Sequence, residues 1–496
     1  MKRAQHKSKE QILTQSDPAK IRKSADAVVL KDGSVFFLTT PAGDVPFNLP
    51  HGFGLFLGDC RFLDGYTLTL NGTEPTVLSG IGARGFETHH HLTNAPLAGA
   101  AGGETLASNR IALHRQRLVR GGVVHELQTL TNHDRTPAAL RLELRFRAKF
   151  EDLFIVKAFT AGPRGQVRPP QVMDRDAVHL SYDGRDGVVR TTEIAFSPPP
   201  SGLDGDRATY ECTLQPGGRY EVAITITPST GRPDEAARAH ADPRTSPAIL
   251  KRWLERSEEI WLARSANVRS SNPLFNRVLR RALLDLRLLR SKLDGLGYFA
   301  AGIPWFVTLF GRDAATVALQ TLPYGADMAR QTLRLLAHHQ ATAFDEYRDA
   351  APGKILHELR TGELARVGAI PQSPAYYGTV DATLLFLILM AEYVRWSGDL
   401  ALARELRPHL DLALAWTEEH ADSDGDGYLD YRGRYANGLV NQGWKDSGNA
   451  IVNADGSLAE PPIALCEVQA YAYRAWRQTA TLLRALDEPE AAGKLE

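Results

Sequence analysis

The spacing of apolar residues changes midway along the chain, and this change limits the possible folds more than any other feature. Between residues 27 and about 228, short segments such as "AALRLELRFRAKF" alternate apolar and polar residues. Alternation of this kind is typical of strands with one buried and one solvated face. Two such segments meet at Gly121-Gly122, which is a hairpin signal. The pattern predicts an antiparallel β-sandwich over residues 25–230.

In the C-terminal half the apolar residues recur with helical period. The segment "SNPLFNRVLRRALLDLRLLRSKL" carries an apolar stripe from Leu274 to Leu293, and Ser271 or Asn272 is expected to cap it. Further helices are expected over residues 313–321, 326–342, 380–397, 400–419 and 462–485. Long loops rich in glycine, tyrosine and charge separate these helices. A binding site is expected where such loops gather at one end of a helical array.

The chain of 496 residues is long enough for two or more domains with sizeable cores. Residues 1–24 are basic and polar without the apolar stretch of a signal peptide, so we expect a disordered leader. Residues 231–270 are rich in Arg, Ala and Glu and predict a helical connector. Residues 271–496 form the expected helical domain.

Charge and cysteine content exclude several classes of protein. The formal net charge is +0 and no apolar run reaches membrane-spanning length, so neither a nucleic-acid nor a membrane partner is expected. Cys60, Cys212 and Cys466 are odd in number and far apart, which fits neither a disulfide framework nor a zinc site. These features favour a reduced, cytoplasmic protein.

The first motif whose residues suit binding or catalysis is "GIPWFVTLFGRDAA". Its aromatic residues include Trp305, and Arg312 and Asp313 follow at the expected start of a helix. Aromatic rings bury the apolar faces of sugars, while Arg and Asp hydrogen-bond to their hydroxyl groups. In isolation, the same residues also fit a capped helix start with an ordinary ion pair.

The second motif, "GKILHELRTGEL", holds His357 and Glu358. A His–Glu pair belongs to zinc sites when a second His follows at helical spacing, and none follows here, so zinc is not expected. Glu358 instead fits a sugar hydroxyl or an acid role, or else a solvated loop. The run His89–His91 lies in a predicted strand, where neighbours face opposite sides, so it is not expected to bind a metal either.

Two further motifs add carboxylates. In "SPAYYGTVDATLLFLIL", Tyr377 precedes Asp381, which suits a sugar or simply the favourable N-terminus of an apolar helix. In "GLVNQGWKDSGNAI", Trp444, Lys445 and Asp446 lie side by side in a loop framed by glycines. A carboxyl group that an indole shields from water can act as a general acid, whereas a close lysine opposes this. The alternative is a polar loop without chemistry.

The run "DSDGDGYLDY" places Asp422, Asp424 and Asp426 at alternate positions, as in the first half of a calcium loop. The twelfth position is Gly433 rather than a glutamate, so an Asx-turn loop is the favoured interpretation. Neither a metal nor a cofactor is therefore expected in this chain.

Taken together, the motifs resemble a known family. "AGIPWFVTLFGRDA", "GKILHELRTGELA", "YYGTVDAT", "GLVNQGWKDSGNAI" and "IALCEVQAYAY", in this order, resemble the bacterial amylo-alpha-1,6-glucosidase (glycogen debranching enzyme-type) proteins. The upstream "GLFLGDCRFLDGYTLTLNG" resembles their N-terminal β-rich domain, so the resemblance covers about residues 25–485. It implies a β-sandwich followed by an (α/α)6 barrel. It also implies hydrolysis of α-glucosidic, above all α-1,6, linkages in glycogen-like glucans with inversion and no cofactor.

Carried over residue by residue, the resemblance makes Asp446 the general acid. Arg312, Asp313 and Asp381 would line the pocket that holds the reacting sugar. The remaining residues expected to contact substrate are Trp305, His357, Glu358, Tyr377, Trp444 and Lys445.

One departure concerns length. Twelve barrel helices with functional loops need well over ~300 residues, whereas about 225 follow Asn272. We therefore expect an incomplete barrel of six or seven helices, whose exposed inner faces favour self-association. Within the barrel the resemblance implies a late catalytic base, and no residue after Asp446 suits it, because Glu460 and Glu467 belong to a mid-barrel motif.

Three functions follow from these observations. The first is hydrolysis of α-glucan or oligosaccharide substrates. The second is hydrolysis of another sugar, of a mannosidase-like or trehalase-like kind, because pocket shape decides specificity and is not readable from sequence. The third is carbohydrate binding without hydrolysis by a catalytically impaired fragment.

Overall fold

The computed structural model describes residues 27–47, 52–98, 105–157, 164–231, 246–370, 375–435 and 438–496. The leader expected over residues 1–24 lies outside them. The chain divides into two compact units. The β unit comprises the described residues up to Ile260 together with Arg280–Leu288 and Gly362–Leu364; the helical unit comprises Trp261–Leu279, Leu289–Thr361 and Ala365–Glu496.

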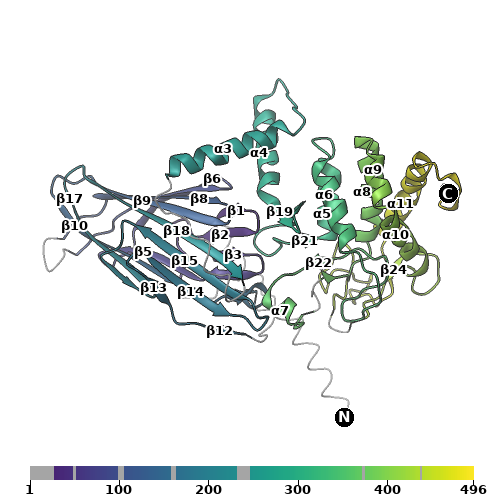
Figure 1. The fold of residues 1–496 in the computed structure, drawn as a ribbon, viewed down its shortest axis with the longest axis horizontal. Helices are drawn as coiled ribbons and strands as arrows, with labels where there is room; N and C mark the ends of the chain where they lie inside the picture. The colour runs from purple at the N-terminus through teal and green to yellow at the C-terminus, as the bar shows by residue number, and fades with distance from the viewer. Residues whose placement is uncertain are drawn as a thin grey trace, which may run out of the picture. The chain divides into compact units, whose positions relative to one another are not determined.

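The β unit is built of three antiparallel sheets, drawn as layers of arrows in Figure 1. The five-stranded sheet has the order β1 (Val28–Asp32), β2 (Val35–Thr39), β3 (Gly54–Leu57), β4 (Cys60–Leu63) and β11 (Glu151–Asp152). The four-stranded sheet has the order β16 (Gly202–Asp204), β17 (Arg207–Leu214), β10 (Ala138–Arg147) and β5 (Gly65–Leu70). The nine-stranded sheet has the order β12 (Gln166–Val167), β14 (Ala177–Asp183), β15 (Val189–Ser197), β18 (Arg219–Gly231), β9 (Val123–Asn132), β8 (Ile111–Arg120), β7 (Glu87–Thr93) and β6 (Thr76–Arg84), with β13 (Gln171–Met173) paired to β14.

Alternation along the strands explains how these sheets pack. Apolar residues of all three sheets, such as Phe62, Tyr66 and Leu130, join one buried core cluster. The predicted hairpin is confirmed, because β8 and β9 pair up to Arg120 opposite Val123 across Gly121-Gly122. Both glycines have positive φ, 59° and 85°, which the primed two-residue turn of a hairpin requires. The antiparallel β part of the predicted fold is therefore confirmed.

The remaining elements are helices and short strands. The helices are α2 (Leu153–Val156), α3 (Pro247–Ala263), α4 (Pro273–Leu289), α5 (Gly311–Thr321), α6 (Asp327–His338), α7 (Glu363–Arg366), α8 (Ala382–Ser397), α9 (Leu400–Glu405), α10 (Arg407–Glu419), α11 (Cys466–Ala485) and α12 (Pro489–Lys494). The short strands are β19 (Arg290–Leu293), β20 (Leu296–Phe299), β21 (Leu309–Phe310), β22 (Glu358–Leu359), β23 (Ala375–Tyr376), β24 (Asp430–Tyr431) and β25 (Ile463–Ala464).

Helix α8 is the centre of the helical unit. It is apolar along nearly its whole length and is buried from Ala382 to Val394. It packs against α5, α6, α10 and α11, as Figure 1 shows for the green and yellow helices. A helix that is hydrophobic all round needs such neighbours on every side. Its N-terminal end brings Asp381 to the loops described below.

Several predicted helices differ in their bounds from those observed, among them α6 and α11, and for two others the local cause is clear. The helix expected to reach Leu293 ends at Leu289, because the following residues form the β19–β20 hairpin. Its N-terminus is capped by Asn272, whose Oδ1 accepts hydrogen bonds from the backbone N–H of Leu274 at 2.9 Å and of Phe275 at 3.3 Å.

The helix expected over residues 400–419 is observed as two helices, α9 and α10, that meet at Leu406. Pro408 lies in the first turn of α10 and has no N–H to continue a helical ladder from α9. Of the expected connector over residues 231–270, the structure describes α3 as helix.

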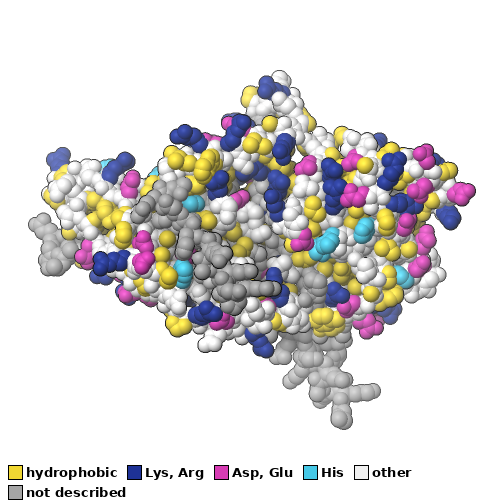
Figure 2. All heavy atoms as spheres, viewed as in Figure 1, with side chains coloured by type: hydrophobic (Ala, Val, Ile, Leu, Met, Phe, Trp, Pro, Cys, Tyr) yellow, Lys and Arg dark blue, Asp and Glu magenta, His cyan; other side chains and the backbone are white. Residues whose placement is uncertain are grey.

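Surface features agree with the absence of a strong net charge. Lysine, arginine, aspartate and glutamate side chains are interspersed on the face shown in Figure 2. Within the described residues, no helix combines the length and the apolar character that crossing a bilayer requires.

Candidate active site

Arg312 joins three segments of the helical unit that are distant in sequence. From the first turn of α5, its Nε donates to Asp381 Oδ2 at 2.7 Å, and its Nη2 donates to the carbonyl oxygen of Gly443 at 2.7 Å. Its Nη1 lies 3.7 Å from Asp446 Oδ2. The guanidinium is buried and Asp446 is 44% exposed. The geometry therefore places the carboxyl group of Asp446 at the solvent-facing side of a buried Arg312–Asp381 ion pair.

A close backbone contact sets the position of Arg312. Gly311 donates its N–H to the carbonyl oxygen of His357 at 2.9 Å. A Cβ atom at Gly311 would lie 2.0 Å from the carbonyl oxygen of Leu356, so only glycine permits this approach. The start of α5 is thus held against the segment that carries His357.

Asp381 is the N-cap residue of α8, yet its side chain makes no capping hydrogen bond. One carboxylate oxygen accepts from Arg312, and the other accepts from the hydroxyl group of Thr379 at 2.8 Å. The carboxylate is thereby held by side chains, in an orientation that serves the cluster rather than the helix N–H groups.

His357 lies buried among the charges of this cluster. Burial, helped by the charge of Arg312, lowers the pKa of His357, although the carboxylates of Glu358, Asp446 and Asp381 act in the opposite direction. The ring is therefore neutral near pH 7. Its Nδ1 is buried and has no hydrogen-bond partner within the described residues. A buried polar atom without a partner is available to a ligand hydroxyl group.

Asp313 is half-buried beside Arg312. Burial raises the pKa of Asp313, while the charge of Arg312 acts to lower it. The charge of Asp381 also acts to raise it. These mutual effects place Asp313 in the same group of charges.

Glu358 forms a separate ion pair, with Arg360. Its carboxylate accepts from Arg360 Nε at 2.8 Å, and both side chains are buried. Arg360 also donates to the backbone carbonyl of Trp305 at 3.1 Å and lies over the ring of Phe310. The indole Nε1 of Trp305 is buried and has no partner within the described residues. Through Arg360, Glu358 thus holds the segment that carries Trp305 and its unpaired indole N–H.

The loop that carries Asp446 exposes both of its preceding residues. Trp444 is 65% exposed and Lys445 is exposed. In the described part of the chain no ion pair joins Lys445 to Asp446, and the cation beside Asp446 is Arg312. Sequence adjacency therefore does not identify the electrostatic partner of this carboxyl group.

Tyr377 points its hydroxyl group elsewhere. The group donates to the carbonyl oxygen of His339 at 2.8 Å, at the C-terminal end of α6. Its predecessor Tyr376 instead reaches the Asp446 loop, where its hydroxyl oxygen accepts from the N–H of Leu439 at 2.9 Å. The structure thus connects Tyr376, rather than Tyr377, to the loop of the cluster.

Asp349 is a residue of this region that the sequence does not reveal. Its Oδ2 accepts from Tyr376 at 2.8 Å and from Gln442 Nε2 at 3.2 Å, and its Oδ1 accepts from the N–H of Arg434 at 2.6 Å. The backbone carbonyl oxygen of Gln442 in turn accepts a hydrogen bond from the N–H of Val380 at 3.0 Å. Asp349 fixes the loop next to α8, and its only sequence signal is its place just before "GKILHE".

Tyr471 of α11 also belongs to this neighbourhood. Burial raises the pKa of Tyr471, and the charges of Asp381 and Glu467 act in the same direction while Arg312 opposes them. Glu467 is half-buried, whereas Glu460 is exposed. The motif "IALCEVQAYAY" could have suggested Tyr471 by its resemblance alone.

The acidic run forms a loop of Asx turns. Asp422 accepts from the backbone N–H of Gly425 at 2.7 Å and of Gly427 at 2.9 Å. These hydrogen bonds, above all the one from Gly427, hold the pKa of Asp422 below its usual range. The carboxylates of Asp422, Asp424 and Asp426 lie close together. That of Asp422 already accepts hydrogen bonds from backbone N–H groups.

Comparisons with known proteins agree with this architecture. A model of the N-terminal domain of some glycogen debranching enzymes matches residues 30–225. No curated protein matches the sequence. The structure is similar to "Putative kojibiose phosphorylase from human microbiome", with a TM-score of 0.60 and 9% identity, over 96% of this chain and 68% of that one. It is also similar to a bacterial glucoamylase complexed with acarbose, with a TM-score of 0.55 and 12% identity, over 93% of this chain and 63% of that one.

Both similarities extend over the β unit and the helical unit, and both proteins are (α/α)6-barrel enzymes. The chain spans about two thirds of the length of each. At these identities the likeness concerns the fold. Residues 30–225 are therefore similar to the N-terminal domain of some glycogen debranching enzymes, and the chain shares its fold with the two solved structures.

Proposed function

We propose that this protein hydrolyses α-glucosidic linkages, above all α-1,6 linkages, in glycogen-like glucans by an inverting acid–base mechanism. One observation carries the proposal. A half-exposed carboxyl group, Asp446, lies 3.7 Å from the buried Arg312 that also binds Asp381. An exposed indole, Trp444, lies two residues before it in the same loop.

These groups suit a sugar. The indole of Trp444 offers a flat apolar face for the CH groups of a glucose unit. Arg312, Asp381 and Asp313 supply charged donors and acceptors for its hydroxyl groups. The unpaired Nδ1 of His357 and Nε1 of Trp305 add two polar atoms without protein partners in the described chain. A ligand that pairs them removes the cost of burying them unpaired.

In the proposed reaction Asp446 donates a proton to the glycosidic oxygen as the bond to the anomeric carbon breaks. Its exposure leaves room for a leaving group on the solvent side. Inversion requires a water molecule on the opposite face of the sugar and a second carboxylate about 6.5–9.5 Å from the first. The proposal assigns the acid to Asp446 and assigns no residue to the base. Lys445 and Glu358 act as neighbours of the substrate or of its binding residues, and Tyr377 supports the end of α6.

The test compares wild-type protein with Asp446→Asn on oligosaccharides that contain α-1,6 or α-1,4 linkages. Asparagine keeps the shape of the side chain and cannot donate the proton. Hydrolysis by the variant should fall roughly 10²- to 10⁴-fold, the usual contribution of a general acid, while glucan binding stays within a few-fold. The anomer first released, followed by NMR, should be inverted relative to the substrate. Unchanged turnover by Asp446→Asn would remove this residue from its role.

Carbohydrate binding without hydrolysis is the second candidate function. It is favoured by the ion pairs of Asp381 with Arg312 and of Glu358 with Arg360, which occupy two buried carboxylates of this region. Glucan binding by the wild-type protein with no release of sugar after long incubation supports this alternative. A hydrolase for a different sugar would release product from another disaccharide in the same assay. Activity in the cytoplasm and self-association through the helical unit are further parts of the proposal, and sedimentation analysis tests the latter.

A further inference from the structure

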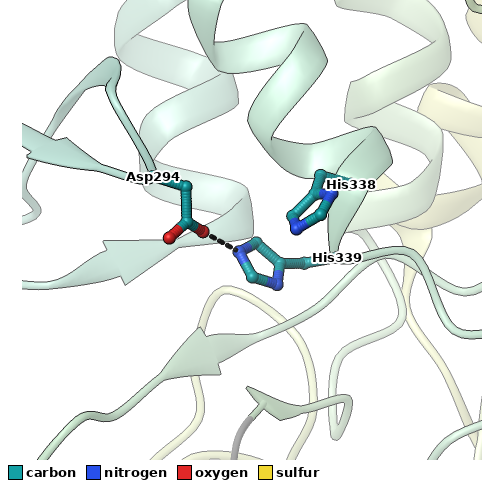
Figure 3. Close-up of side chains that lie close together, drawn as sticks. All are labelled: Asp294, His338 and His339. Atoms are coloured by element: carbon teal, nitrogen blue, oxygen red, sulfur yellow. Dashed lines mark ion pairs between the residues drawn. The ribbon is translucent and has the colours of Figure 1, made fainter.

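Three metal-ligating side chains meet in the helical unit outside the Arg312 cluster. Asp294 comes from the turn between β19 and β20, and His338 and His339 come from the C-terminal end of α6 (Figure 3). One ligand atom from each residue lies within 4.8 Å of the others. The spacing of these residues in the sequence does not predict a site, because 44 positions separate the aspartate from the first histidine.

The spacing of the atoms approaches that of a metal site. Nε2 of His339 lies 3.4 Å from Oδ2 of Asp294. With zinc bonds of about 2.0–2.1 Å, two ligand atoms of a tetrahedral site lie about 3.3–3.4 Å apart. This pair therefore already has the separation that a shared ion needs. Figure 3 shows the His338 ring beside that of His339, and because the His338 side chain is exposed it is free to turn toward the pair.

The fold holds the donors on ordered elements. Asp294 and Gly295 form a two-residue turn with φ of 51° and 79°, and Leu293 pairs with Leu296 across it. Strand β20 packs against α6, which ends at His338. The carboxylate and the two imidazoles thus come from two elements that pack together, and an ion between them would tie the hairpin to the helix.

The state of His339 suits a ligand. Its Nε2 is buried and faces the carboxylate of Asp294, whose Oδ2 lies 3.4 Å away. An imidazole nitrogen beside a carboxylate oxygen is a common pair of zinc ligands. On α10, His409 lies near His338 but uses its Nδ1 to bind Gln340 Oε1 at 2.8 Å.

We propose that Asp294, His338 and His339 bind a divalent transition-metal ion, zinc first among them, with water as the fourth ligand. Two imidazole nitrogens and one carboxylate oxygen match the donors of zinc and of cobalt in its place. Calcium and magnesium prefer oxygen ligands and are not expected here. The ion stabilises the junction of the β19–β20 hairpin with α6.

The experiment uses the full chain, freed of any affinity tag and treated with a chelator. Cobalt(II) is added and its visible absorption is recorded, and zinc is then titrated by calorimetry. We expect one ion per chain in the wild-type protein. Asp294→Asn and His338→Gln, both at exposed positions, should each weaken binding by at least roughly 10- to 100-fold, since loss of an outer partner alone costs that much.

Three matched variants serve as controls. His409→Gln removes the nearby imidazole outside the set, Asp424→Asn changes the acidic loop, and His114→Gln changes the histidines stacked with His89 and His91 on β7 and β8. All three should bind zinc as the wild-type protein does. The proposal is overturned if the wild-type protein binds no cobalt or zinc. It is equally overturned if binding survives both Asp294→Asn and His338→Gln, or if it is lost in a control variant.

Discussion

Replacing Asp349 by alanine should loosen the loop that carries Asp446. The buried carboxylate of Asp349 accepts hydrogen bonds from the Tyr376 hydroxyl, the Gln442 amide and the Arg434 N–H. The alanine variant leaves all three donors without this acceptor. A buried donor left unpaired costs about 1–3 kcal/mol.

Three such donors would cost about 3–9 kcal/mol if the terms added, and water that enters the truncated site reduces the expected loss to about 3–5 kcal/mol. Asp349→Asn keeps one acceptor oxygen and should lose less. Tyr376→Phe removes one of the three bonds and should lose about 1–2 kcal/mol.

The free energy of unfolding of each variant is measured in urea, and glucan binding is measured on the folded protein. Because Gln442 precedes Gly443, whose carbonyl binds Arg312, Asp349→Ala should also weaken glucan binding in the fraction that remains folded. A urea midpoint of Asp349→Ala equal to that of the wild-type protein would refute the reasoning. So would a larger loss in Asp349→Asn than in Asp349→Ala.

The remaining predictions concern stability, pH and the exposed indole. Gly311→Ala should destabilise the protein in urea by about 1–3 kcal/mol, because its Cβ would meet the Leu356 carbonyl oxygen at 2.0 Å, whereas Gly493→Ala, with open space around it, should not. Burial, followed by the charges of neighbouring arginines, lowers the pKa of His90 to about 3. Its contribution to stability is therefore full above about pH 6.5 and is lost as the pH falls toward 3, so His90→Gln should show a smaller drop in melting temperature between pH 7 and pH 5 than the wild-type protein. An equal or larger drop contradicts this. Trp444→Ala should leave the melting temperature unchanged because the side chain is 65% exposed, yet weaken glucan binding about tenfold; unchanged binding argues against an indole platform.

Local features of the sequence determined much of the fold. The alternation of "AALRLELRFRAKF" appears as β10 with alternating burial. Gly121-Gly122 forms the predicted turn because glycine adopts positive φ without strain. Asn272 caps α4 because its side chain can reach the free N–H groups of the first turn. These features act within a few residues, so a single sequence reveals them.

The contents of the site depend on tertiary structure. Lys445 adjoins Asp446 in sequence, yet Arg312 of α5 is the cation beside it, because the path of the loop, and not adjacency, decides which side chains meet. The sequence marks Tyr377, whereas Tyr376 and Asp349 hold the loop through bonds that span many residues.

The end of α4 and the proposed metal site follow the same rule. The apolar stripe continues to Leu293, but pairing of β19 with β20 outweighs helical propensity there. That hairpin then carries Asp294 to His339 at the far end of α6. The sequence by itself determined which segments form strands and helices, since those preferences arise from neighbouring residues. Only the packed chain decided which charges share a cluster, because that depends on distances between segments remote in sequence.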